Sequence, residues 1–260
     1  DARAAAKGMR TVSFRLATAA WVMCGLGLGA GCGIDVPLGS HDAGSSACGA
    51  EVVAGLWRDE TFGTCGVVTV DLGGGDNVFS GTGSFALDTQ GRPVIATTSR
   101  GMNTGPDLAA LRLQSDGTRD PTFGDGGVVQ TDFGGIEEHG LSVLAQADGK
   151  VLVVGYVIVP VAGMFPKAVA MRLRPDGTFD DTINGDGRFF PTHNSTHEVC
   201  GTVLPRANGG FFMGCYSYEA YPGPTNLALM ARRPDGGAEP GFGPGNDGWS
   251  GFDFAGGDEL

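Results

Sequence analysis

Two histidines and a carboxylate are the first residues whose types and spacing could support chemistry. His193 and His197 stand four positions apart, and Glu198 follows directly. On a helix this spacing would bring both imidazoles to one face, where they could bind a metal ion such as zinc. The surrounding sequence lacks a helical pattern, and the repeat described below places the segment between two strands. We therefore predict solvated loop histidines, with a metal site at His193 and His197 as the alternative.

Three short loops combine glycine with the oxygen-bearing side chains that calcium favours. They are Gly124-Asp125-Gly126, Asn184-Gly185-Asp186-Gly187 and Gly245-Asn246-Asp247-Gly248. None has the acidic spacing or the terminal glutamate of an EF-hand loop, and tight turns explain Asp-Gly and Asn-Gly sequences without a ligand. We expect no cofactor, with calcium at these loops as the alternative.

Acidic pairs offer little support for catalysis. Glu137-Glu138 and Asp180-Asp181 are adjacent in sequence, and neighbouring residues of a strand point to opposite faces, so neither pair would converge on one substrate. The sequence also has no Gly-x-Ser-x-Gly nucleophile elbow and no phosphate-binding loop of the G-x-x-x-x-G-K-[S/T] type. These observations favour a protein that is not an enzyme.

The first 31 residues have the pattern of an export signal. Met9, which we interpret as the initiator, is followed by Arg10 and Arg15 and then by an apolar run from Leu16 to Ala30. A basic segment, an apolar segment and small residues at its end are typical of a secretory signal peptide. We predict a signal peptide at 1–31 and a flexible tether at 32–57, where no sustained period is present.

The end of this segment resembles the lipobox of bacterial lipoproteins. It reads Leu28-Gly29-Ala30-Gly31-Cys32, with the leucine one position further from the cysteine than is usual. The resemblance implies that Cys32 is acylated and becomes the new N-terminus. Ordinary signal cleavage near the same place, followed by secretion without lipid, is the alternative.

The cysteine count agrees with an oxidising compartment. The chain has six cysteines; Cys24 lies in the predicted signal peptide and Cys32 is the predicted lipid site. The remaining even set allows three connectivities, of which we favour Cys48–Cys65 and Cys200–Cys215. The second pair is the better supported, because a predicted hairpin places both cysteines on neighbouring strands.

Internal repetition is the main signal in this sequence. A Phe-Gly marker, an Asp-Gly marker after an apolar stretch, and a second glycine turn each recur about every 60 residues. The first marker is Thr61-Phe62-Gly63, Thr122-Phe123-Gly124, Thr182-Ile183-Asn184 and Gly241-Phe242-Gly243; the second is Asp116-Gly117, Asp176-Gly177 and Asp235-Gly236; the third is Gln90-Gly91, Asp148-Gly149 and Asn208-Gly209. Three markers with one period predict a tandem array.

Within one unit the strands can be placed. Leu141–Gln146 and Lys150–Val159 flank an Ala-Asp-Gly sequence, which predicts a hairpin because Asp and Gly tolerate positive φ. Ala168–Arg174 follows as a third strand and Arg188–Thr192 as a fourth, matching 127–132 one unit earlier. The apolar run Val151-Leu152-Val153-Val154 predicts a strand covered on both faces. Four short strands per unit are typical of propeller blades.

The repeat resembles the delta-60 repeat, a bacterial β-propeller-like family. The closest stretches are Asp120-Pro121-Thr122-Phe123-Gly124 through Phe133-Gly134, then Ala147-Asp148-Gly149-Lys150 through Gly155, and Arg174-Pro175-Asp176-Gly177. About three complete blades and partial ones fit within 58–260, fewer than the four that a closed propeller typically needs, so we expect an all-β fold from a fragment of a longer protein. The resemblance covers the same span. It implies no active site.

Composition limits the partners. The formal net charge is −12, which disfavours nucleic acid and a polybasic membrane contact, so we expect membrane contact only through the lipid. We predict a non-enzymatic scaffold of the cell envelope, either an outer-membrane lipoprotein or secreted, that binds an unidentified protein or glycan.

Trp249, Phe252 and Phe254 are expected in the strand core, with surface contact as the alternative. An enzymatic propeller, such as a hydrolase, lyase or quinoprotein-like oxidoreductase with part of its site beyond this chain, is the rival hypothesis.

Overall fold

The computed structural model describes residue 59 and residues 61–72, 84–100, 105–135, 137–160, 165–191, 197–218 and 226–252. The chain divides into two units, Asp1–Leu56 and Trp57–Leu260, and every described residue belongs to the second. The predictions for the signal peptide, the tether, Cys32, Cys48 and His193 therefore lie outside the described residues. In the part of the chain that is described, no helix has the length and apolar character needed to cross a membrane.

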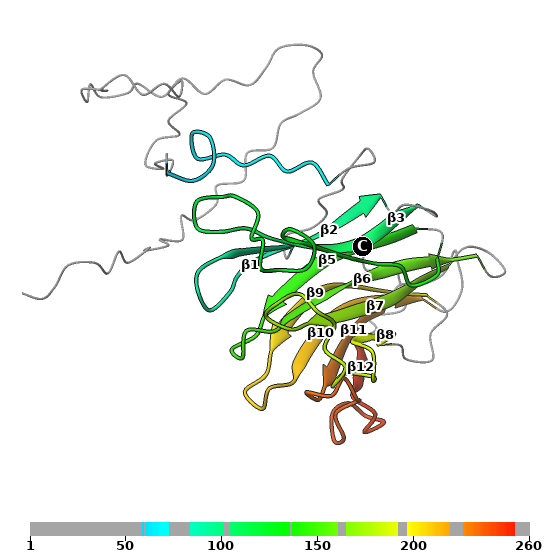
Figure 1. The fold of residues 1–260 in the computed structure, drawn as a ribbon. Coiled ribbons are helices and arrows are strands. Elements are labelled where there is room, and N and C mark those ends of the chain that lie inside the picture. Colours follow the sequence, from blue (N-terminus) through cyan, green and yellow to red (C-terminus); the bar gives the residue numbers. More distant parts are fainter. Residues whose placement is uncertain are drawn as a thin grey trace, which may run out of the picture. The chain divides into compact units, whose positions relative to one another are not determined.

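The described residues form three four-stranded antiparallel sheets, and within each sheet the strand order follows the chain (Figure 1). The fold is all-β with one four-stranded sheet per repeat, as predicted. The first sheet contains β1 (Phe85–Leu87), β2 (Pro93–Arg100), β3 (Pro106–Arg112) and β4 (Val128–Thr131). The second contains β5 (Glu137–Ala145), β6 (Val151–Val159), β7 (Phe165–Leu173) and β8 (Arg188–Phe189). The third contains β9 (His197–Pro205), β10 (Phe211–Tyr218), β11 (Asn226–Arg232) and β12 (Trp249–Phe252).

The hairpin between β5 and β6 shows how local sequence sets these strands. The backbone N–H of Gly149 donates to the carbonyl of Gln146 at 2.9 Å, and the N–H of Gln146 donates to the carbonyl of Lys150 at 2.8 Å. Gly149 has φ of +83°, a conformation that glycine adopts without steric cost. The predicted turn is confirmed. Residues 151–154 of β6 are fully buried, which confirms a strand covered on both faces.

Two apolar cores join the three sheets. The first junction, between the first and second sheets, contains Ala96, Leu108, Phe123, Val153 and Met171, with others of the same character. The second junction, between the second and third sheets, contains Leu152, Ala170, Ile183, Phe211 and Met230, with others. Side chains alternate across β6, so it contributes Val153 to one core and Leu152 to the other. The second sheet is therefore buried on both faces.

The Asp-Gly and Phe-Gly markers of the repeat meet in space. The N–H of Gly124 donates to the carbonyl of Asp176 in the next repeat at 2.9 Å, and Gly63 makes the same bond to Asp116 at 2.7 Å. A Cβ on Gly177 would lie 2.3 Å from the Gly124 nitrogen, and its φ is +84°. Glycine is thus required there both by conformation and by the close approach of the neighbouring unit.

The placement of His197 in a solvated loop was wrong. His197 begins β9, is only 2% exposed, and its ring meets that of Phe165 edge-on at a centroid distance of 4.0 Å. In the second sheet, β5 likewise begins at Glu137 rather than at Leu141. The reason is pairing: β9 is extended because β10 continues far enough to pair Tyr218 with His197.

Candidate functional site

Buried arginine–aspartate pairs occur at the same place in the first two repeats. The Arg112 Nε donates to Asp120 Oδ2 at 2.7 Å, and the Arg172 Nε donates to Asp180 Oδ2 at 2.7 Å. A threonine hydroxyl satisfies the other oxygen of each aspartate, from Thr122 at 2.7 Å and from Thr182 at 2.8 Å. All four charged side chains are almost completely buried.

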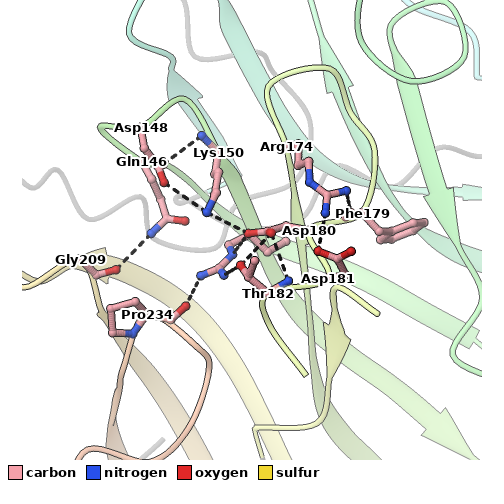
Figure 2. Close-up of polar contacts among 11 residues, drawn as sticks. Gln146, Asp148, Lys150, Arg174, Phe179, Asp180, Asp181, Thr182, Gly209 and Pro234 are labelled. Carbon is pink, nitrogen blue, oxygen red and sulfur yellow. Dashed lines mark hydrogen bonds and ion pairs between the residues drawn. The ribbon is translucent and has the colours of Figure 1, made fainter. Parts of the chain in front are cut away.

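Each of these arginines also reaches the next repeat. The Arg112 Nη1 donates to the carbonyl of Pro175 at 2.6 Å, and the Arg172 Nη1 donates to the carbonyl of Pro234. Figure 2 shows the polar contacts around Asp180, where Lys150 adds an ion pair at 3.1 Å. These charges serve to hold successive repeats together, and we refer to each set as a clasp.

Electrostatics keep the clasp carboxylate ionised. Burial alone would raise the pKa of Asp180, but hydrogen bonds from Thr182 and Lys150 and the charge of Arg172 outweigh it, so the pKa lies well below its ordinary 3.8. A carboxylate held in this way acts as a structural anion and is poorly suited to general acid–base catalysis near neutral pH.

A second group of charges has no such compensation. Carboxylate oxygens of Asp107 on β3, Asp132 after β4 and Glu138 on β5 lie within 4.8 Å of one another. Asp132 is exposed, Asp107 is half-buried and Glu138 is only 1% exposed. In the part of the chain that the structure describes, none of the three forms an ion pair with lysine, arginine or histidine. We call this group the acidic cluster.

One carboxylate oxygen of Glu138 accepts hydrogen bonds and the other accepts none. Its Oε1 accepts hydrogen bonds from the N–H of Phe133 at 2.8 Å and of Gly135 at 3.3 Å. Its Oε2 is buried and has no hydrogen-bond partner. Burial, together with the charges of Asp132 and Asp107, raises the pKa of Glu138 to about 7 against those two hydrogen bonds. Burial and the charge of Asp132 also raise the pKa of Asp107.

The outer face of the third sheet is apolar and hollowed. A cavity of about 490 Å³ on this face is lined by Thr202, Tyr216, Leu227, Leu229 and Phe252, among others. Leu227 and Phe252 are exposed. Large apolar side chains gathered on one face are unusual for a surface that contacts only water.

The predicted site residues fall in different places. The Cys200–Cys215 disulfide is present and links β9 to β10 with a Cα–Cα distance of 4.0 Å. Cys65 is also disulfide-bonded. Adjacent acids point apart as predicted, because Glu138 and Asp180 are buried whereas Glu137 and Asp181 are exposed.

The loops considered for calcium bind their own backbone. Asp186 Oδ1 accepts from the N–H of Arg188 at 3.0 Å, and Asp247 Oδ1 accepts from the N–H of Trp249 at 3.1 Å. Asn184 and Asn246 have φ of +51° and +54°, as tight turns require. Among the aromatics, Trp249 packs against the second-junction core, whereas Phe252 is 46% exposed and Phe254 lies outside the described residues.

Sequence reasoning missed the clasps and the acidic cluster. The clasps had a detectable signal, because Arg112 and Arg172, like Asp120 and Asp180, are related by the 60-residue period. The acidic cluster had none, because its members come from two repeats and only the stacking of the sheets brings them together.

Comparison with known proteins agrees with the architecture. A model of the family described as "Domain of unknown function (DUF5122) beta-propeller" matches residues 91–123 and 146–182. The first segment covers β2, β3, Arg112 and Asp120, and the second covers β6, β7, Arg172 and Asp180. A search of curated proteins gave no match. The described residues therefore form a propeller-like repeat structure, and the three sheets within them are stacked without closing into a ring.

Proposed function

We propose that this protein is a non-enzymatic repeat scaffold of the cell envelope, anchored by a lipid on Cys32. The observation that carries the proposal is that the buried charges of the protein hold its repeats together. In the first two described repeats the buried arginine binds the buried aspartate and also the next repeat, which leaves no nucleophile–base pair among the described residues of the clasps. The resemblance to delta-60 repeats, the basic and apolar start and the even cysteine set support an exported scaffold.

Lipid attachment is tested by metabolic labelling with an alkyne fatty acid in a bacterial host. Label that depends on Cys32 supports the anchor, so Cys32→Ala should abolish it. Cys24→Ala is the matched control and should retain the label, because Cys24 lies within the predicted signal peptide. Label that persists in the Cys32→Ala variant, or is absent from the native chain, would sink this part of the proposal.

The scaffold offers the outer face of the third sheet to its partner. Leu227 and Leu229 stand at the register positions of Ala168 and Ala170, since β11 pairs with β10 as β7 pairs with β6. Those two alanines are covered by the third sheet. The outer face of the third sheet thus has apolar side chains at the same register positions that the second sheet uses to contact the third sheet.

The partner that fits this face is a protein presenting an aliphatic β-sheet surface. A glycan would need many converging hydrogen-bonding groups. The residues that line this cavity are mostly aliphatic and aromatic, with hydroxyls only from Thr202 and Tyr216. Burial of Leu227 and Phe252 by apolar side chains would contribute about 25 cal/mol for each Å² removed from water.

Photocrosslinking from position 227 tests the partner. A benzoylphenylalanine at Leu227 should give a protein adduct in living cells, and the same probe at Phe85 should not, because Phe85 is also exposed but lies on the first sheet. Binding to a glycan array that is lost in Leu227→Asp, without a protein adduct, would instead identify the partner as a glycan and overturn the choice of a protein.

A further inference from the structure

The acidic cluster lies at the first junction and takes no part in the scaffold function proposed above. Asp107 and Asp132 belong to the first repeat, whereas Glu138 belongs to the second. We propose that these three carboxylates bind a calcium ion that links the first sheet to the second.

The spacing of the oxygens suits calcium. Calcium binds six to eight oxygens at 2.3–2.6 Å, so two oxygens on one ion can lie about 5 Å apart at most. The three carboxylates offer oxygens that are all within 4.8 Å of one another. Magnesium requires shorter bonds of about 2.0–2.1 Å and near-ideal octahedral geometry, which makes it a poorer match to this looser arrangement. The exposure of Asp132 leaves room for water to complete the coordination.

Glu138 supplies an independent reason to expect a ligand. Its side chain is almost completely buried, and one of its carboxylate oxygens lies within 4.8 Å of an oxygen of each aspartate. The N–H groups of Phe133 and Gly135 bind Oε1 and thereby fix the carboxylate, while Oε2 is buried without a hydrogen-bond partner. A buried carboxylate oxygen without a partner is costly, and a cation coordinated at this point would remove that cost.

The second junction provides an internal comparison. Glu138 pairs with Val157 in the second sheet as Glu198 pairs with Ser217 in the third, so Glu198 is the repeat equivalent of Glu138. Asp107 pairs with Ser99 as Lys167 pairs with Val157, so Lys167 is the equivalent of Asp107. The second junction therefore carries a fixed positive charge at the register position where the first carries a carboxylate.

This difference gives the first junction a reason to bind a cation that the second junction does not share at this register position. A lysine at one register position and a glutamate at the other can balance charge within the chain. Three carboxylates gathered at one point repel each other, and a cation from solution would relieve that repulsion. Calcium would supply at the first junction the positive charge that the Lys167 side chain supplies at the second.

Calorimetric titration of the full chain with calcium chloride, after removal of metal with EGTA, tests the proposal. We expect saturable binding of one calcium ion per chain and a higher thermal midpoint in calcium than in EGTA. Glu138→Gln keeps the shape and the hydrogen-bond acceptor but removes the charge, and it should weaken binding at least tenfold. Asp107→Asn should do the same at a partly exposed position, which provides a second variant if Glu138→Gln fails to fold.

Two further variants separate this site from other acidic sites. Asp125→Asn changes a glycine-rich loop that was considered for calcium from the sequence, and it should leave the affinity unchanged. Asp107→Lys copies the second junction, and it should abolish calcium binding while raising the thermal midpoint in EGTA. Absence of saturable binding would overturn the proposal, as would binding that Asp125→Asn abolishes or that Glu138→Gln and Asp107→Asn leave intact.

Discussion

The two junctions between the sheets are built on one plan but stabilised by different chemistry. Each has an apolar core and a clasp that reaches the carbonyl of the next Pro-Asp-Gly turn. The first junction adds the acidic cluster, whereas the sheet beyond the second adds a disulfide. Cys200 and Cys215 pair at the register position of Gly140 and Gly155 in the second sheet. Repetition of the fold therefore constrains the clasps and turns, and leaves other positions free to diverge.

The largest expected effect comes from breaking a clasp. Arg172→Met leaves Asp180 buried with only Lys150 and Thr182, and removes the bond to Pro234 at the second junction. We expect the free energy of unfolding to fall by about 3–5 kcal/mol, as for other buried ion pairs that lose one partner. Urea denaturation followed by circular dichroism measures this change.

Arg174→Met is the matched control for the clasp. The Arg174–Asp181 pair is largely exposed, so its loss should change stability by less than about 1 kcal/mol. Similar losses from Arg172→Met and Arg174→Met would show that the clasp is no stronger than a surface pair.

Loss of the disulfide in the third sheet should lower the free energy of unfolding somewhat less than loss of a clasp. Cys200 and Cys215 are 15 residues apart, and closing a loop of this length stabilises a folded chain by about 3 kcal/mol in the chain-entropy account. The double variant Cys200→Ser with Cys215→Ser should lose about this much in urea denaturation. No loss would mean that the paired strands already hold the loop closed.

The same bridge should not transfer to the second sheet. A Cβ on Gly155 would lie 1.8 Å from the His139 carbonyl oxygen, and a Cβ on Gly140 would lie 2.5 Å from that of Thr97 in the first sheet. Gly140→Cys with Gly155→Cys should therefore lower the thermal midpoint even when oxidised. A higher midpoint would show that the glycines are not required by the close approach of the backbones.

Two turn glycines, one packed against the neighbouring repeat at the first junction and one with open space around it, can be compared by substitution. Gly177→Ala would place a Cβ 2.3 Å from the Gly124 nitrogen, while a Cβ on Gly91 would meet nothing within 4 Å. Both glycines have positive φ, so both variants lose about 1 kcal/mol from strain. Gly177→Ala should lose about 1–3 kcal/mol more, since the two repeats must move apart. Equal losses by chemical denaturation would contradict a tight contact at this turn.

The smallest effect concerns acid. The pKa of Asp180 is lower in the folded protein than its ordinary 3.8, so this group contributes stability above pH 3.8 that is lost as the pH falls through the folded value. Thermal midpoints measured between pH 5 and pH 2 should fall, and Asp180→Asn should have a lower midpoint at pH 5 but a shallower decline. A decline equally steep in the variant would place the acid sensitivity elsewhere.

Part of this structure could be predicted from neighbouring residues alone. The Ala147-Asp148-Gly149 turn, the fully buried run at 151–154 and the opposite orientation of Glu137 and Glu138 in β5 follow from backbone preference and strand alternation. The start of β9 at His197 did not, because it depends on how far β10 extends as its partner. The exposure of Phe252 also depends on what covers the third sheet.

The sequence by itself determined the repeat, the number of strands in each unit and the turns that join them. These features depend on φ preferences and apolar alternation, which are encoded within a few consecutive residues. Only the tertiary structure decided that Arg112 reaches Pro175, 63 positions away, and that Asp107, Asp132 and Glu138 meet at one point. Both depend on the distance and register between sheets, which the side chains of two repeats set jointly as they pack.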